Sequence, residues 1–393
     1  MKKVLIIGAS ILQLPAIKRA KELGYYVGVI DYDPNAVGIP YADEYFNVST
    51  IDIEGVVKTA EQFAPDGIMT LATDMPMRSI AAACERLGLP GISFDTAVRA
   101  TDKGEMIKAF AAHGVEHPWY FILSAPAELE AVIGEISFPC ISKPTDNSGS
   151  RGVVLIHNEQ ELREAIAYSS ENGRSGGVIV EEYMQGPEVS VEVIVLGGVP
   201  HVLNVTDKLT TGAPHFVEMG HSQPSRLAEA DLDKIRDLAC RAALAVGIAN
   251  GPAHVEIILT KDGPKMVELG ARMGGDCITT HLVPLSTGID MIEATIRIAC
   301  GETPDIERKF CRGSAIRYFN PPVGRITAIG GVEEAKALAG VKEISFVKKI
   351  GDTVGAIGSS TDRVGFVIAQ AEDAAAAVSV CEDACKTVCI CIL

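Results

Sequence analysis

A lysine beside a small polar loop is the first feature of this sequence that could do chemistry. Lys143 ends a predicted strand, and the loop 147–152, which reads Asn-Ser-Gly-Ser-Arg-Gly, leads into the next strand. Backbone N–H groups with few side chains in the way, next to a lysine, can form a cradle for a phosphate. The same residue types also make ordinary turns that bind nothing. The loop alone leaves both interpretations open, although the chain contains no Walker A motif.

Two glutamates on neighbouring predicted strands could bind a metal ion. The strands flank a predicted three-residue hairpin loop in which Gly263 takes the left-handed position. This register places Glu256 opposite Glu268, with Val255 and Val267 on the other face. Like charges directly opposite each other destabilise a sheet, unless their side chains turn outward into water or share a cation. Carboxylate oxygens suit Mg²⁺, which completes its coordination with substrate phosphates. The pair is therefore either solvated or part of a metal site.

An arginine four residues after the second glutamate could stabilise charge during phosphoryl transfer. Arg272 lies in a segment with glycines at 270, 274 and 275, which indicates close packing of the backbone. A fixed cation there could stabilise the negative charge that develops as a phosphoryl group moves. The ordinary alternative is a surface salt bridge. Together the lysine loop, the glutamate pair and the arginine predict a nucleotide site with a divalent metal.

Composition limits the class of protein. The chain has 393 residues, enough for two or three domains, and a net charge of −16. It shows no Lys/Arg-rich stretch and no run of 18 apolar residues, so neither nucleic-acid binding nor a membrane span is predicted. Ten cysteines without paired spacing and without a recognisable signal peptide predict free thiols in the cytoplasm. A homodimer is expected only because dimers are the commonest oligomers. Buried thiols are predicted at the end of the chain for Cys381, Cys385, Cys389 and Cys391.

The elements that must position these residues fall into three predicted domains. Residues 1–95 alternate strand and helix, which predicts a parallel Rossmann-like sheet. Residues 96–305 contain two α+β lobes, of which the smaller covers about 115–184. Residues 306–393 are predicted to form a C-terminal α+β domain whose last helix covers 371–386.

The first strand–helix unit raises the alternative of an NAD-dependent oxidoreductase. Its fingerprint G-x-G-x-x-G fails, because Ser10 and Gln13 stand after Gly8 where glycines are needed. Asp31 does end the second strand, where an acid could bind a ribose. A Rossmann-like domain without a dinucleotide is the favoured interpretation.

The order of these features resembles the ATP-grasp superfamily, and within it the carboxylate–amine ligases of the L-amino acid ligase type. The resemblance covers residues 1–305 in good order and the remainder more loosely. Each matching element is short, but their order and spacing together are specific. The matching elements are Lys103, Lys143 with its loop, Glu181-Glu182-Tyr183-Met184, Glu188, Lys208, Glu256, Glu268 and Arg272.

This resemblance implies an α/β ATP-grasp fold: a Rossmann-like pre-ATP-grasp domain, two α+β lobes that clasp ATP, and a C-terminal α+β domain. It also implies a role for each element. The phosphates of ATP would be held by Lys103, Lys143, Ser148, Gly149, Ser150 and Lys208, the adenine by Glu181, Tyr183 and Met184, and the ribose by Glu188. The metal, Mg²⁺ or Mn²⁺, would be held by Glu256 and Glu268, the acyl phosphate by Arg272, and the amino acid substrates by Glu218 and His221.

The implied reaction is an ADP-forming ligation of two small molecules. ATP would phosphorylate a carboxylate, and an amine would then displace the phosphate from the acyl phosphate, as in other reactions that depend on positioning and charge stabilisation. One residue departs from the family pattern. Gly270 stands where many members carry an asparagine that contacts the metal, so metal binding would rest on the two glutamates with help from Glu218.

Two alternatives to this ligase stay open on the sequence. The first is an ATP-grasp enzyme of purine or bicarbonate metabolism, such as a carboxylase or a formyltransferase, which would use the same acyl-phosphate step. The second is a nucleotide-binding protein without catalysis, for which Gly270 is the only support. The segment 217–225, which contains Glu218 and His221, suits the amino acid ligases better than the purine enzymes.

Overall fold

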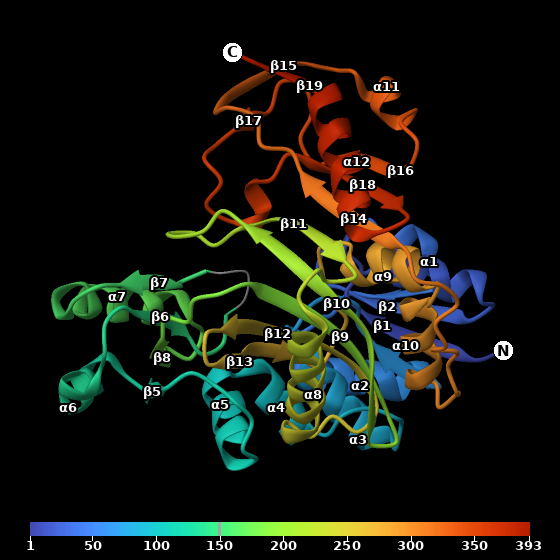
Figure 1. Cartoon of the computed structure of the whole chain (residues 1–393). Coiled ribbons are helices and arrows are strands. Elements are labelled where there is room, and N and C mark those ends of the chain that lie inside the picture. Colours follow the sequence, from blue (N-terminus) through green and yellow to red (C-terminus); the bar gives the residue numbers. More distant parts are fainter. Residues whose placement is uncertain (148–150) are drawn as a thin grey trace.

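The computed structural model describes residues 1–147 and 151–393 of the chain. Figure 1 shows a small lobe (green) on one side of a central sheet, the N-terminal unit (blue) on the other, and the C-terminal part (orange to red) above. The described strands form four sheets, of four, eight, three and four strands. This arrangement agrees with the predicted Rossmann-like unit, two lobes and C-terminal α+β part. Within the described ranges, no helix is both long and apolar enough to cross a membrane.

The N-terminal unit is a parallel sheet, as the alternation of strand and helix predicted. Its strands pair in parallel in the order β3-β2-β1-β4. Buried aliphatic side chains of β1 and β2 pack against the apolar faces of the helices. The elements of this unit are β1 (Lys3–Ile7), α1 (Leu14–Glu22), β2 (Tyr26–Ile30), η1 (Ile39–Tyr41), β3 (Glu44–Phe46), α2 (Ile53–Phe63), β4 (Gly67–Met69) and α3 (Met77–Leu87).

The turn after β1 is filled by protein groups and not arranged for a dinucleotide. Gly8 has a φ of +100°, and a Cβ there would come within 2.9 Å of the buried side chain of Gln13. The carboxylate of Asp31 accepts the backbone N–H of Ala9 at 2.7 Å and that of Asp33 at 2.9 Å. Asp31 is therefore committed to holding this turn, which argues against the NAD alternative.

The small lobe is an antiparallel sheet in the order β5-β8-β6-β7, with its own apolar core. Two consecutive helices lead into it, and each has a capped start. The side chain of Ser93 accepts the N–H of Thr96, and that of Asp102 accepts the N–H of Glu105. The elements are α4 (Phe94–Thr101), α5 (Lys103–Ala112), β5 (Tyr120–Leu123), η2 (Pro126–Glu128), α6 (Leu129–Val132), η3 (Ile133–Glu135), β6 (Cys140–Pro144), β7 (Val154–Ile156), α7 (Glu159–Asn172) and β8 (Val178–Glu182).

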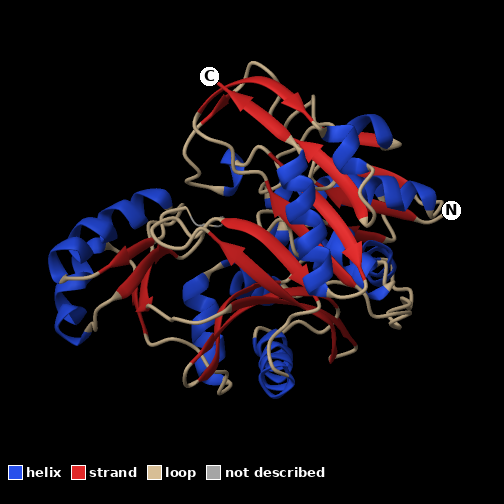
Figure 2. Cartoon of the chain, turned by 45° about the horizontal axis from the view of Figure 1, so that its top comes forward, coloured by secondary structure: helices blue, strands red, loops and turns tan. Residues whose placement is uncertain are grey.

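The central sheet has eight strands in the order β13-β12-β9-β10-β11-β14-β18-β16. Figure 2 shows its strands running from the edge next to the small lobe into the C-terminal part. Helix α8 packs against β9, β10, β12 and β13, and their aliphatic side chains share one core. The elements of the large lobe are β9 (Glu188–Leu196), β10 (Val199–Thr210), β11 (Glu218–Gln223), α8 (Glu229–Ala245), β12 (Gly251–Thr260), β13 (Gly263–Gly270), the π-helix η4 (Ile278–Leu282), α9 (Val283–Thr287) and α10 (Met291–Ala299).

The C-terminal part continues the central sheet and adds a three-stranded sheet in the order β17-β15-β19. Because β14 pairs with β11, the proposed domain boundary at residue 306 does not interrupt the sheet. The elements are β14 (Gly313–Tyr318), β15 (Gly324–Gly330), α11 (Val332–Lys336), β16 (Val341–Phe346), β17 (Thr353–Val354), η5 (Ser360–Asp362), β18 (Gly365–Ala371), α12 (Ala374–Thr387) and β19 (Cys389–Ile392).

The prediction of buried thiols at the end of the chain is wrong for the last two. Cys381 on α12 is buried and Cys385 is half-buried, but Cys389 and Cys391 are exposed. The predicted final helix ends at Thr387, and the chain then forms β19. Alternation along this strand turns its isoleucines toward the core and its cysteines toward solvent.

Candidate active site

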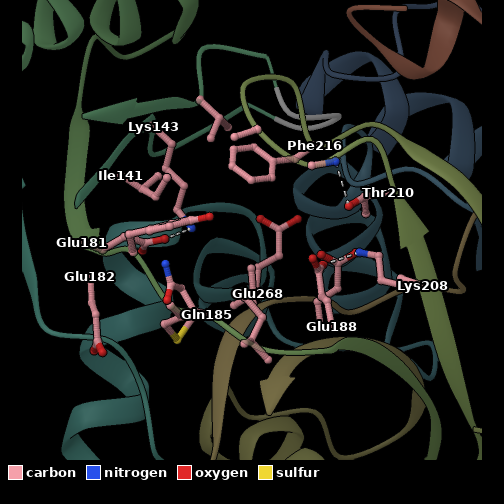
Figure 3. A pocket seen from close by; sticks show the side chains of 18 of the residues that line it. Ile141, Lys143, Glu181, Glu182, Gln185, Glu188, Lys208, Thr210, Phe216 and Glu268 are labelled. Atoms are coloured by element: carbon pink, nitrogen blue, oxygen red, sulfur yellow. Dashed lines mark hydrogen bonds and ion pairs between the residues drawn. The ribbon is translucent and has the colours of Figure 1, made fainter. Parts of the chain in front are cut away.

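A cavity of about 480 Å³ opens between the small lobe and the central sheet. Figure 3 shows side chains of the small lobe, such as Lys143 and Glu181, facing Glu188, Lys208 and Glu268 of the central sheet. Ser148, Gly149 and Ser150, which were predicted to hold phosphate, lie outside the described residues. The other predicted nucleotide, metal and substrate residues that line this cavity are Lys103, Lys143, Glu181, Tyr183, Met184, Glu188, Lys208, Glu218, Glu256 and Glu268.

The small lobe contributes an ion pair to this cavity. Nζ of Lys143 on β6 lies 2.5 Å from Oε1 of Glu181 on β8, and both side chains are 7% exposed. Strands β6 and β8 are adjacent, and Glu181 pairs with Ile141. Lys143 lies two residues after Ile141 on the same strand, so the side chains of Lys143 and Glu181 lie on the same face of the sheet. The structure thus brings together a residue predicted to hold phosphate and a residue predicted to read adenine.

The central sheet contributes one lysine surrounded by three glutamates. Nζ of Lys208 on β10 lies 2.6 Å from Glu188, 3.2 Å from Glu256 and 3.5 Å from Glu218, and the lysine side chain is 3% exposed. Burial alone would lower the pKa of Lys208, but the three carboxylates raise it well above its ordinary value. Lys208 is therefore a permanent cation in this cluster.

The three glutamates carry more negative charge than Lys208 can balance. Burial and repulsion from neighbouring carboxylates raise the pKa of Glu188 in spite of its lysine partner. Burial would also raise the pKa of Glu256, but Lys208 and His254 hold it well below its ordinary value. A further cation brought in with a nucleotide would relieve this repulsion.

The predicted pairing of Glu256 with Glu268 is confirmed, but the turn that precedes it differs from the prediction. Thr260 pairs with Gly263, so the loop has two residues and not three. The pairing of β12 with β13 then shifts by one residue between Ile257 and Glu256, and Val267 is the extra residue of a bulge. The bulge compensates for the shorter loop. Val267 consequently lines the cavity between the small lobe and the central sheet, and the prediction that it lies on the opposite face is wrong.

The donor set fits a divalent metal held jointly with phosphates. The paired carboxylates of β12 and β13 are the oxygen ligands that Mg²⁺ accepts, and Mg²⁺ usually keeps water or phosphate in its remaining positions. Among the described residues, no group of three or more His, Cys, Asp or Glu side chains forms a ready-made metal cage. Glu256 and Glu268 are the residues that could hold the ion on the protein side.

Lys103 connects the glutamate pair to the small lobe. Its Nζ lies 3.0 Å from Oε2 of Glu268 and donates to the backbone oxygen of Asn147 at 2.7 Å. Its own N–H donates to the backbone oxygen of Thr145 at 2.7 Å. Burial would lower the pKa of Lys103, but Glu268 raises it. The lysine is thus a charged clamp between α5, β13 and the loop that follows β6.

A second cavity of about 420 Å³ lies against the N-terminal unit and meets the first at the glutamate pair. Lys103, Asn147, Glu256 and Glu268 line both cavities. The second cavity has the N-terminal residues of α3 on its other wall. A nucleotide in the first cavity and another molecule in the second would therefore meet at the two carboxylates.

Arg272 lies in the second cavity and is held by an acid from the N-terminal unit. Its Nε lies 2.9 Å from Oδ1 of Asp74, and its Nη2 lies 3.0 Å from Oδ2. The arginine side chain is only 15% exposed, so this is not the surface salt bridge considered as an alternative. Burial would lower the pKa of Arg272, but Asp74 raises it, and the arginine stays charged. Sequence reasoning missed Asp74, which lies 198 residues away and belongs to no motif.

The Asp74–Arg272 pair accounts for the glycine at position 270, where the family pattern has asparagine. A Cβ on Gly270 would lie 2.7 Å from Oδ1 of Asp74 and 2.9 Å from Nε of Arg272. A side chain at this position would displace the ion pair. The glycine that removes one metal contact of the family pattern therefore makes room for a fixed guanidinium.

A buried histidine supports Glu256 from behind. Nδ1 of His254 lies 2.6 Å from Oε1 of Glu192, which is fully buried, and Nε2 lies 3.3 Å from Oε1 of Glu256. Burial lowers the pKa of His254, but Glu192 and Glu256 together raise it to about 9. The sequence gives His254 and Glu192 no recognisable role in the site, since Glu192 reads as part of an apolar strand and His254 as a packed strand residue.

We expect Gly274→Ala to destabilise the protein through this buried pair. A Cβ on Gly274 would lie 2.6 Å from Nδ1 of His254 and 2.9 Å from Oε1 of Glu192, and overpacking of this kind costs about 1–3 kcal/mol. Gly275→Ala is the matched control, because nothing lies within 4 Å of a Cβ there. Thermal unfolding should show a lower Tm for the first variant alone. Equal Tm values for the two variants would contradict the packing described here.

Glu218 and His221 share strand β11 but lie in different surroundings. Glu218 lines the first cavity beside Lys208. His221 is 2% exposed and lines neither of the two cavities; its Nε2 lies 3.3 Å from Oδ2 of Asp276. Within the described residues, its Nδ1 has no hydrogen-bond partner. Substrate contact by His221 stays a prediction, and the structure places this side chain behind the site.

The C-terminal part reaches this strand through Arg363. Its guanidinium donates to both oxygens of Asp276, at 2.7 and 2.8 Å, and to the backbone oxygen of Glu218 at 3.1 Å. It also lies over the ring of Tyr318, 3.8 Å from the centroid. Burial would raise the pKa of Asp276, but His221 and Arg363 lower it. No motif in the sequence identifies this link.

We expect Arg363→Gln to weaken both the fold and the site. The change leaves the half-buried Asp276 without its main partner and frees the backbone oxygen of Glu218, and losing hydrogen bonds to a charged group costs about 1.5–3 kcal/mol. Arg325→Gln is the control, because the side chain of that exposed arginine of the same part donates to the backbone oxygen of Gly351 and, among the described residues, pairs with no carboxylate. Chemical denaturation and the KM for ATP should both change in the first variant. Unchanged KM and stability would contradict a supporting role for the C-terminal part.

Comparison with known proteins agrees with this geometry. Residues 136–280 match the ATP-grasp domain family, and residues 317–392 match L-amino acid ligase C-terminal domain 2. The chain is 28% identical to alanine–anticapsin ligase of Bacillus subtilis over 76% of its length, and 23% identical to carnosine synthase 1 of Homo sapiens over 77%. It spans between 40% and 67% of the length of the first curated relatives it matches.

A solved structure matches over the whole chain. The L-amino acid ligase from Bacillus licheniformis has a TM-score of 0.86 and 25% identity, with 100% of this chain and 99% of that chain covered. The predicted fold and family are therefore confirmed. The chain contains an ATP-grasp domain over residues 136–280 and L-amino acid ligase C-terminal domain 2 over residues 317–392.

Proposed function

We propose that this protein is an ATP-dependent, ADP-forming carboxylate–amine ligase whose substrates are amino acids. The observation that carries the proposal is the junction of two cavities at Lys103, Glu256 and Glu268. One cavity has the charges and size for a nucleotide, and the other has a fixed arginine and room for small molecules. The similarity of the chain to alanine–anticapsin ligase and to the L-amino acid ligase supports the assignment.

In this proposal ATP lies in the first cavity with its phosphates toward the junction. Apolar side chains such as Ile141, Met184 and Ile258 would pack against the adenine, and Glu188 would accept hydrogen bonds from the ribose. Lys143, Lys103 and Lys208 would bind the phosphates. Mg²⁺, held by Glu256 and Glu268, would neutralise phosphate charge when bound.

The chemistry proceeds in two displacements at the junction. An oxygen of the substrate carboxylate attacks the γ-phosphorus, the bond to the bridging oxygen breaks, and ADP leaves with the electron pair. The amine nitrogen then attacks the acyl carbon and loses a proton, and phosphate leaves as the C–O bond breaks. Arg272, held by Asp74 beside the junction, would stabilise the negative charge on the acyl oxygen and on the departing phosphate.

A panel assay tests this proposal. The purified protein is incubated with ATP, Mg²⁺ and amino acids, singly and in pairs, while phosphate release and product masses are recorded. We expect ADP, phosphate and a mass equal to two amino acids minus water. AMP with pyrophosphate would contradict the mechanism, and turnover only with phosphoribosyl amines or bicarbonate would favour the purine-type alternative. The homodimer and the cytoplasmic location stay proposals, to be tested by light scattering and by fractionation of cells.

A further inference from the structure

The second cavity contains a guanidinium that forms no ion pair with a carboxylate of the described residues. Arg78, in the first turn of α3, lines this cavity, and its Nε donates to Oγ1 of Thr101 at 2.8 Å. Within residues 1–147 and 151–393, Thr101 is the only hydrogen-bond partner of this side chain. An arginine has five N–H donors, so its two terminal nitrogens are left with four.

The carboxylates in the same cavity are already committed to other groups. None of them is therefore the counter-ion of Arg78, and an outside anion would fill that role. These carboxylates and their partners are Asp74 with Arg272, Asp146 with the backbone N–H groups of Arg174 and Ser175, Glu256 with Lys208 and His254, and Glu268 with Lys103.

The free edge of Arg78 is held in a fixed orientation. Oγ1 of Thr101 donates to the backbone oxygen of Ala97 at 2.7 Å, which leaves its lone pairs for Nε of Arg78. With Nε occupied, the planar guanidinium keeps the N–H groups of its two terminal nitrogens as a parallel pair of donors. Such a pair matches the two oxygens of a carboxylate, which it binds through two parallel hydrogen bonds.

The position of Arg78 separates it from the reacting groups. Lys103, Glu256 and Glu268 line both cavities, whereas Arg78 lines only the second, on the wall formed by the N-terminal unit. A carboxylate that is phosphorylated must lie at the junction. A carboxylate bound by Arg78 is therefore one that does not react. Ile51 and Met75, which are 50% and 38% exposed, line the same cavity and offer an apolar surface for a side chain.

We propose that Arg78 binds the free carboxylate of the amino acid that supplies the amine. This assignment rests on the ligase function proposed above and adds the residue that recognises the second substrate. That substrate carries an unblocked carboxylate, and its amine reaches toward the junction. Arg78 selects free amino acids over amines that lack this carboxylate.

The test compares an amino acid with its carboxamide as the amine substrate. Product formation is measured for the wild type, Arg78→Gln and Arg78→Lys, with Arg86→Gln as the control on the exposed side of the same helix. Wild type and control should prefer the free acid by about 10- to 100-fold in kcat/KM, the range expected for a hydrogen-bonded charge. Arg78→Gln should lose this preference by losing rate with the acid alone, and Arg78→Lys should recover part of it.

The outcomes separate this assignment from the ligase proposal. If product forms and Arg78→Gln slows the reactions of the acid and of the carboxamide equally, or slows neither reaction, the assignment to Arg78 is overturned while the ligase proposal stands. A loss confined to activated substrates with a second carboxylate would also overturn it, since the anion would then belong to the other substrate. If turnover occurred only with phosphorylated amines, the anion bound by Arg78 would be a phosphate, and the carboxylate assignment would be overturned. Absence of product from every pair with the wild type would overturn both proposals.

Discussion

Glu256→Gln is expected to lower the rate of ADP formation by about 10³-fold at saturating ATP and amino acids. The change removes one of the two carboxylates that face each other across β12 and β13. It also removes a negative charge from Lys208, which still keeps Glu188 and Glu218 as partners. The fold should therefore persist while metal-dependent catalysis is lost.

The measurement is a titration of ADP formation with Mg²⁺. The variant should need more Mg²⁺ for half-maximal activity, and its maximal rate should remain low. Glu116→Gln is the matched control, because that glutamate forms an exposed ion pair with Arg241 away from both carboxylates. Activity of Glu256→Gln within threefold of the wild type, with an unchanged Mg²⁺ requirement, would remove the metal role from this residue.

Arg272→Gln is expected to lower kcat by about 10²- to 10³-fold, the usual effect of losing a fixed donor aimed at developing charge. The guanidinium is oriented by two hydrogen bonds to Asp74, so Asp74→Asn should also reduce kcat, though by a smaller factor. A double-mutant cycle separates two explanations, because residues in contact show non-additive effects.

If Arg272 acts on the substrate, the double variant Arg272→Gln with Asp74→Asn should be no more active than Arg272→Gln alone. If Arg272 serves only to neutralise Asp74, the double variant should recover most of the activity, since the unpaired carboxylate is gone. Recovery to within tenfold of the wild type would contradict a role in catalysis. Thermal unfolding of the three variants shows whether a loss of rate comes from a loss of structure.

Features with a short-range signal were predictable from the sequence. The alternation of residues on β12 and β13 was enough to place Glu256 opposite Glu268, even though the loop length was wrong, because a bulge at Val267 restored the register. The parallel N-terminal sheet followed from its strand–helix alternation. Lys208 and the three carboxylates around it were identified through the family resemblance, but their gathering around the lysine was not.

Contacts between distant segments had no such signal. Asp74 reaches Arg272 from the N-terminal unit, Glu192 lies within an otherwise apolar strand, and Arg363 joins Asp276 from the C-terminal part. Each pair depends on how separate elements pack, and periodicity within one element says nothing of its neighbours. The exposed thiols of β19 were mispredicted for the same reason, because the strand forms only by pairing with β15.

The formation of an acyl phosphate is the central claim, and oxygen-isotope transfer tests it most directly. An amino acid labelled with ¹⁸O in its carboxylate is supplied with ATP, Mg²⁺ and the second amino acid, and the released phosphate is analysed by mass spectrometry. The account predicts one ¹⁸O atom in each phosphate released with product, because the carboxylate oxygen that attacks the γ-phosphorus leaves with it. Unlabelled phosphate accompanying a labelled product would contradict the account, since the carboxylate would then never have been phosphorylated.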